Sequence, residues 1–116
     1  MRKLCSLAEL PASGCKEFRL EVDGVELPCF LVRHQGLVRA YRNRCPHTGA
    51  PLNWNPDVFL NLEGTHIQCD IHNAQFRIDD GLCLLGPCVG RALEPVTVLE
   101  RDGEIWLAAA KDIHKA

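Results

Sequence analysis

Hydrophobic and charged residues alternate along residues 16–22, where Phe18, Leu20 and Val22 stand between Glu and Arg side chains. A repeat of two residues is typical of a strand with one buried face. The dipeptide Asp23-Gly24 follows, and it favours a tight hairpin because glycine accepts the positive φ of such turns. The segment therefore predicts one strand and an antiparallel return.

The rest of the chain continues as short apolar segments separated by Gly, Pro, Asn and Asp. Strand signals every eight to twelve residues or so are typical of an all-β sandwich or barrel. No helical repeat of about ten residues or longer is visible. Strands are predicted over residues 16–22, 26–33, 37–42, 59–62, 65–69, 75–78, 93–100 and 104–109.

The two ends of the chain carry weaker signals. Residues 1–15 contain spaced leucines, which allow one helical turn or a loose edge, and the polar residues from Lys111 onward predict a frayed end. A chain of 116 residues fits one hydrophobic core. We expect a single domain over residues 1–116, with 1–15 and 111–116 peripheral to it.

Composition and charge exclude several classes of function. Hydrophobic residues make up 47% of the chain and charged residues 24%, with a net charge of −2. This balance gives no basic field for nucleic acid, and no apolar run approaches the roughly 20 residues of a membrane span. Glu9 and Pro11 interrupt the first apolar segment before it reaches the length of an export signal. We expect a cytoplasmic protein that acts on neither membrane nor nucleic acid.

Seven cysteines are many for this length. Their odd number and irregular spacing do not suit the disulfide framework of a small secreted domain. A reducing compartment, with some thiols bound to a metal, fits better. Cys5, Cys15 and Cys29 lie outside any cluster and are expected to be small buried hydrophobes.

Two segments each pair a thiol with an imidazole: Cys45-Pro46-His47 and Cys69-Asp70-Ile71-His72, with 21 residues between them. A Cys₂His₂ zinc finger carries both cysteines in one knuckle and both histidines on one helix. Here each segment holds one of each, which suits two metal ions, with the cysteines on one iron and the histidines on the other. A zinc site remains the alternative.

The order Cys-x-His, spacer, Cys-x-x-His resembles the signature of the Rieske [2Fe-2S] family, in which two histidines replace two cysteines on one iron. Phe76, Gly81 and Gly86-Pro87 extend the resemblance, the last pair to the proline loop that covers the cluster. The likeness spans residues 37–107. It implies an antiparallel β-sandwich with a cluster-binding subdomain, at about residues 43–90, of two loops plus a proline loop.

The resemblance also implies the cofactor and its ligands. One Rieske-type [2Fe-2S] cluster per chain would be bound by Cys45, His47, Cys69 and His72. No catalytic residue is implied.

Departures from the family pattern indicate the subtype. Ala50 and Ile71 stand where respiratory-chain Rieske proteins have two further cysteines joined in a disulfide. Ala74 and Phe76 replace a serine and a tyrosine that donate hydrogen bonds to sulfur. Fewer donors imply a potential near the low end of the Rieske range, roughly −150 mV rather than +300 mV.

Other departures leave details open. Asp70-Ile71 and Asn73 replace a Pro-Trp pair and a glycine that are usual in soluble members, so the second loop is open to a different backbone. Cys83 and Cys88 lie near the proline loop and correspond to no known ligand.

Two functions fit the resemblance. The first is a soluble, ferredoxin-like one-electron carrier that takes electrons from a flavin-dependent reductase and passes them to an oxygenase or a similar acceptor. The second is a redox-sensing or accessory small subunit of a reductase or oxygenase complex. A catalytic oxygenase is not expected, because 116 residues leave no room for a second, mononuclear iron domain.

Overall fold

The computed structural model describes residues 2–11, 14–46, 48–53, 57–70 and 73–108. No helix in these ranges is both long and apolar enough to cross a membrane. The elements are β1 (Arg2–Ser6), the 3₁₀ helix η1 (Leu7–Glu9), β2 (Cys15–Val22), β3 (Val25–His34), β4 (Leu37–Arg42), β5 (His66–Gln68), β6 (Gln75–Arg77), β7 (Cys83–Leu85), β8 (Val98–Arg101) and β9 (Glu104–Leu107).

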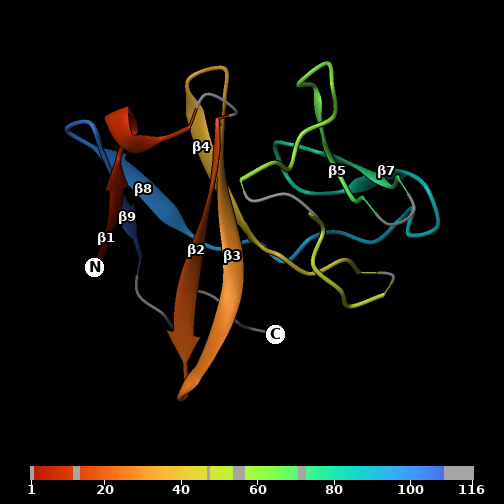
Figure 1. Ribbon diagram of the computed structural model, residues 1–116, viewed down its shortest axis with the longest axis horizontal. Coiled ribbons are helices and arrows are strands. Elements are labelled where there is room, and N and C mark those ends of the chain that lie inside the picture. Colours follow the sequence, from red (N-terminus) through yellow and green to blue (C-terminus); the bar gives the residue numbers. More distant parts are fainter. Residues whose placement is uncertain (1, 12–13, 47, 54–56, 71–72, 109–116) are drawn as a thin grey trace.

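The strands form three antiparallel sheets of three strands each, in the orders β1-β9-β8, β2-β3-β4 and β5-β6-β7. Figure 1 shows the first two sheets on one side of the molecule, with β5 and β7 among the loops on the other. The all-β, antiparallel prediction is confirmed.

Strand β3 is the middle strand of its sheet, and residues 29–32 are buried on both of its faces. Phe30 and Val32 belong to one core cluster, whereas Cys29 and Leu31 belong to the other. Successive side chains of a strand point to opposite faces, so this sheet separates the two clusters. The second cluster joins it to the sheet β1-β9-β8 and consists of Cys5, Leu20, Cys29, Leu31, Ala40, Val96, Ile105 and Leu107.

The first cluster joins the central sheet to the loop side of the molecule. Phe30 stacks on Phe59, with ring centroids 4.1 Å apart and 6° between the planes. The hydroxyl group of Tyr41 donates a 2.6 Å hydrogen bond to the carbonyl oxygen of Ile78. These contacts fix the sheet β5-β6-β7 and its loops against the central sheet.

The predicted strand positions are correct for the hairpins and less accurate elsewhere. Residues 93–97, predicted as strand, form only one isolated bridge, between Pro95 and Tyr41, and the extended ladder begins at Val98. The segment 59–62 makes one bridge, between Leu60 and Ile67. Residues 2–6, expected as a helical turn or loose edge, form β1 and pair with β9.

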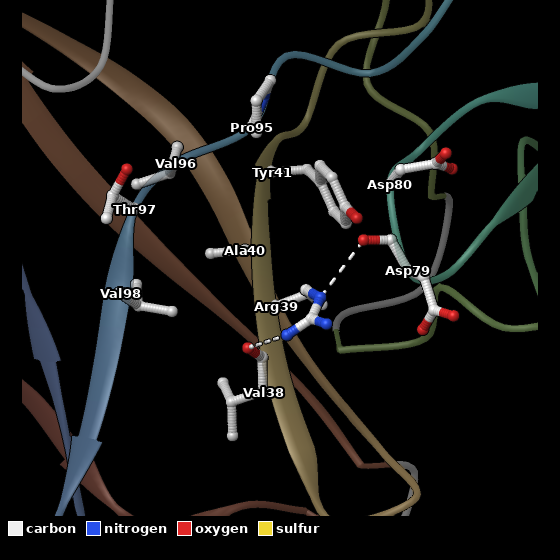
Figure 2. A pocket seen from close by; sticks show the side chains of 10 residues that line it. All are labelled: Val38, Arg39, Ala40, Tyr41, Asp79, Asp80, Pro95, Val96, Thr97 and Val98. Carbon is white, nitrogen blue, oxygen red and sulfur yellow. Dashed lines mark hydrogen bonds between the residues drawn. The ribbon is translucent and has the colours of Figure 1, made fainter.

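A hollow of about 330 Å³ lies beside β4, lined by residues 38–41, 79–80 and 95–98. Figure 2 shows Arg39 reaching across it, with its Nε atom 3.1 Å from the carbonyl oxygen of Asp79. The lining contains no cysteine or histidine. The guanidinium group therefore links β4 to the turn after β6.

Gly81 offers a test of how the turn after β6 packs against Tyr41 of β4. An added Cβ atom would lie 2.9 Å from the Cε1 atom of Tyr41, and the residue has φ +75°. Gly64 has φ +73° with nothing within 4 Å of an added Cβ atom, so it is a matched control for the backbone effect alone.

We expect Gly81→Ala to lower the free energy of unfolding by about 1–3 kcal/mol more than Gly64→Ala, because overpacking adds to the cost of a positive φ. Urea unfolding of both variants measures the difference. Equal losses would contradict the close contact between Gly81 and Tyr41.

Candidate metal centre

The first loop begins three residues after β4 and is closed by main-chain hydrogen bonds around Cys45. The Cys45 amide donates to the carbonyl oxygen of Ala50, and the Gly49 amide donates to that of Cys45, both at 2.8 Å. Gly49 has φ +79°, which favours glycine at the turn. Cys45 is only 2% exposed, although this residue lies outside the regular strands.

The second loop connects β5 to β6 and carries Cys69, which is fully buried. The Cys69 amide donates a 2.9 Å hydrogen bond to the carbonyl oxygen of Ala74. Asn73 has φ +55°, in the left-handed region that Asn tolerates better than most residues. Asn73 therefore adopts a backbone conformation that glycine also adopts readily. The replacement of the usual glycine by asparagine is compatible with this turn.

The two loops are joined through Leu52 and Asn43. The Asp70 amide donates to the carbonyl oxygen of Leu52 at 2.8 Å, and the Leu52 amide donates to Oδ1 of Asn43 at 2.7 Å. Asn43 is only 5% exposed, and its Nδ2 atom donates to Oδ1 of Asn53 at 2.8 Å. One buried amide side chain thus positions the segment that links the cysteine loops.

Sequence reasoning did not identify Asn43 as a positioning residue. Its place at the end of a predicted strand is also typical of an ordinary turn, and no local motif separates the two roles. Its partners are nine and ten residues away along the chain.

The third loop follows β7 and contains Gly86-Pro87, the predicted proline loop. It contacts both of the other loops. A Cβ atom at Gly86 would lie 2.8 Å from the Cα atom of Ala74, so the two backbones approach as closely as a glycine permits. The Nη1 atom of Arg91 donates a 3.1 Å hydrogen bond to the carbonyl oxygen of Pro46. The third loop is therefore packed on the second loop and bonded to the first.

Four cysteine side chains, those of Cys45, Cys69, Cys83 and Cys88, belong to the same buried cluster. Burial raises the pKa of Cys88, and the hydrogen bond and charge of Cys83 raise it further, followed by the charges of Cys45 and Cys69. The four thiols thus share one buried part of the core.

Of the other cysteines, Cys15 belongs to the same core cluster, whereas Cys5 and Cys29 belong to the second one. Cys5, Cys15 and Cys29 are all buried. Burial raises the pKa of both Cys15 and Cys29 to about 11, which disfavours their charged forms. All three cysteines pack as small side chains in the core, as the sequence predicts.

The predicted ligands are only partly within the described chain. The structure brings Cys45 and Cys69 into one core cluster, while His47 and His72 lie outside the described residues, as does Ile71, which stands where respiratory-chain members have a disulfide cysteine. In the ranges that are described, no three Cys, His, Asp or Glu side chains form a metal-binding group. The predicted four-residue ligand set stays a prediction.

The chemistry of the described donors fits an iron–sulfur cluster. Thiolates are soft ligands that suit such clusters, and each of these two thiols lies buried in a separate loop. Ala74 and Phe76, which pack beside Cys69 in the same core cluster, have side chains without a donor group. The two cysteine loops thus offer sulfur ligands in apolar surroundings.

Comparison with solved structures shows the same fold in two ferredoxins. The ferredoxin of carbazole 1,9a-dioxygenase from Nocardioides aromaticivorans IC177 is 26% identical, with a TM-score of 0.68 over 93% of this chain and 95% of that one. The Sphingomonas yanoikuyae B1 ferredoxin is 21% identical, with a TM-score of 0.67 over 92% and 96% of the two chains.

A third structure, a complex of reduced oxygenase and oxidized ferredoxin in carbazole 1,9a-dioxygenase, contains a chain that is 24% identical, with a TM-score of 0.68. The match covers 91% of this chain and 99% of that one. A search of curated proteins found no match.

The model of the Rieske [2Fe-2S] domain family matches residues 2–108, which is nearly the whole chain. This match includes both cysteine loops, the third loop and all nine strands. The chain belongs to the Rieske [2Fe-2S] domain family, and its cofactor is the [2Fe-2S] cluster of that family.

Proposed function

We propose that this protein is a one-electron carrier whose [2Fe-2S] cluster is bound by Cys45, His47, Cys69 and His72. The observation that carries the proposal is the burial of the Cys45 and Cys69 thiols in two interlocked loops. The likeness to the ferredoxin of carbazole 1,9a-dioxygenase, across 95% of that chain, supports a carrier rather than a catalytic role.

When bound, the cluster supplies a site that gains and loses one electron. Cys45 and Cys69 would hold it through their thiolates, and the apolar side chains around these thiols would keep water away from them. Leu52, Ala74 and Phe76 belong to the same hydrophobic core as the two thiols, and each is at most 1% exposed. Ala74 and Phe76 provide no side-chain hydrogen bond to sulfur, and this is why the sequence predicts a low reduction potential. That potential stays a prediction.

We propose a flavin-dependent reductase as the electron donor and an oxygenase, or a similar redox enzyme, as the acceptor. A solved complex of oxygenase and ferredoxin in carbazole 1,9a-dioxygenase contains a chain of the same fold, which supports the choice of acceptor. Leu85 and Val89, on either side of Gly86-Pro87, are 58% and 62% exposed and offer apolar contact beside the cysteine loops. The cytoplasmic location stays a prediction.

The carrier is tested with Cys69→Ser against Cys29→Ala. Both cysteines are buried, but Cys29 lies in the other core cluster. We expect Cys69→Ser to lose its iron and the ability to pass electrons from a flavoprotein reductase to an oxygenase, whereas Cys29→Ala keeps both. Iron analysis and stopped-flow reduction measure these properties.

A Cys69→Ser protein with the parent's iron content and electron transfer would contradict the ligand assignment. A parent protein that is reduced quickly but never passes its electron to an oxygenase would instead favour the sensor or accessory subunit.

The third loop is tested with Gly86→Ala against Gly90→Ala. An added Cβ atom at Gly86 meets the Ala74 backbone at 2.8 Å, whereas at Gly90, with φ +93°, it meets nothing within 4 Å. We expect Gly86→Ala to cost about 1–3 kcal/mol more in unfolding free energy and to release iron faster on heating. Loss of the visible absorption of the cluster during heating provides the measurement, and equal behaviour of the two variants would contradict a close third loop.

A further inference from the structure

Two thiols that the proposed ligand set does not use lie against each other in the third loop. The Sγ atoms of Cys83 and Cys88 are 3.0 Å apart, with the Cys88 thiol donating to the sulfur of Cys83. Both residues are buried, at 1% and 2% exposed. The pair is therefore set apart from solvent and aligned sulfur to sulfur.

Main-chain hydrogen bonds hold the backbone on both sides of this pair. The Cys83 amide donates to the carbonyl oxygen of Arg91 at 2.8 Å, and the Arg91 amide donates to that of Cys88 at 2.9 Å. A disulfide has an S–S distance of about 2.05 Å, so bond formation requires the sulfur atoms to approach by only about 1 Å.

The sulfur atoms lie one layer beneath the surface. Leu84, Leu85, Pro87 and Val89, the neighbours of the two cysteines along the chain, are all exposed. An opening of this loop would therefore bring both thiols into contact with solvent. Hydrogen peroxide is a small, uncharged molecule that oxidises thiols, which makes it the oxidant that suits a buried pair.

We propose that Cys83 and Cys88 form a reversible disulfide that closes the third loop when the protein meets hydrogen peroxide. One sulfur attacks peroxide, so an S–O bond forms, the O–O bond breaks and one water leaves with the thiol proton, giving a sulfenic acid. The second thiol attacks that sulfur, so the S–S bond forms, the S–O bond breaks and a second water leaves.

The balance is two thiols and one peroxide to one disulfide and two waters. The sulfur atoms lose two electrons in total and peroxide gains them. A dithiol reductant reverses the change by thiol–disulfide exchange and becomes a disulfide itself.

Closure of this loop reaches the cluster loops through contacts already described. Gly86, between the two cysteines, lies against Ala74, and Arg91 is bonded to Pro46. A shift of the loop is therefore passed to both neighbours, and the effect on the cluster rests on the proposed function. The disulfide itself does not, because neither cysteine belongs to the proposed ligand set.

The sequence makes the test simple. Trypsin releases residues 78–91, which contain Cys83 and Cys88 and no other cysteine, and residues 20–33, which contain only Cys29. Purified, cluster-loaded protein is treated with a stoichiometric amount of hydrogen peroxide, alkylated under denaturing conditions, digested and weighed by mass spectrometry. Iron content is measured on the same sample.

We expect the 78–91 peptide to lose both alkyl groups and to weigh two hydrogens less than the dithiol form, while the 20–33 peptide stays alkylated and iron is retained. Dithiothreitol should restore both alkylation sites. In Cys88→Ala the remaining Cys83 should give no such species.

The proposal is overturned if peroxide leaves both thiols alkylatable after Cys29 has been oxidised or iron released, or if the peptide gains oxygen without forming the disulfide. Cys69→Ser separates this proposal from the proposed function. If Cys69→Ser still forms the disulfide, the disulfide proposal holds in a protein that lacks this proposed ligand. If the parent protein contains no cluster, the ligand assignment is wrong and the disulfide proposal is unaffected.

Discussion

The burial of two thiols outside any regular strand depends on main-chain hydrogen bonds that close each loop on itself. Cys45 is bonded to Ala50 in this way, and Cys69 to Ala74. Without these bonds, buried amide and carbonyl groups would be left unpaired, at a cost of about 1–3 kcal/mol each. The loops can therefore surround sulfur with apolar side chains and still satisfy their own backbone.

The loops do not stand alone, since each is supported by another part of the chain. Asn43 bonds the backbone of Leu52, whose carbonyl oxygen accepts from Asp70 in the second loop. Behind them, the central sheet is buried on both faces by the two core clusters. This arrangement gives the loops a platform that the sheet β1-β9-β8 supports from the far side.

The sequence predicted best what is decided locally. The alternation over residues 16–22 and the turn at Asp23-Gly24 yield the hairpin of β2 and β3, in which every pair is in register from Cys15 with Val32 to Val22 with Val25. The spacing of Cys45 and Cys69 with their histidines led to the family, which the domain match confirms.

What sequence reasoning missed is decided by residues far apart in the chain. Strand β1 forms because it pairs with β9, about 100 residues later, and nothing within Arg2–Ser6 predicts that pairing. The close approach of Gly86 to Ala74 likewise depends on two loops meeting in space. The facing of Cys83 and Cys88 follows from the turn between them, which spacing alone did not reveal.

The most direct test of the account concerns the ligands of the cluster. Pulsed electron paramagnetic resonance on the reduced protein, grown with ¹⁵N-labelled histidine, detects nitrogen atoms bonded to iron. We expect couplings from two histidine nitrogens, of which one disappears in His47→Cys and the other in His72→Cys. A cluster without histidine couplings, or a colourless protein that contains zinc, would contradict it.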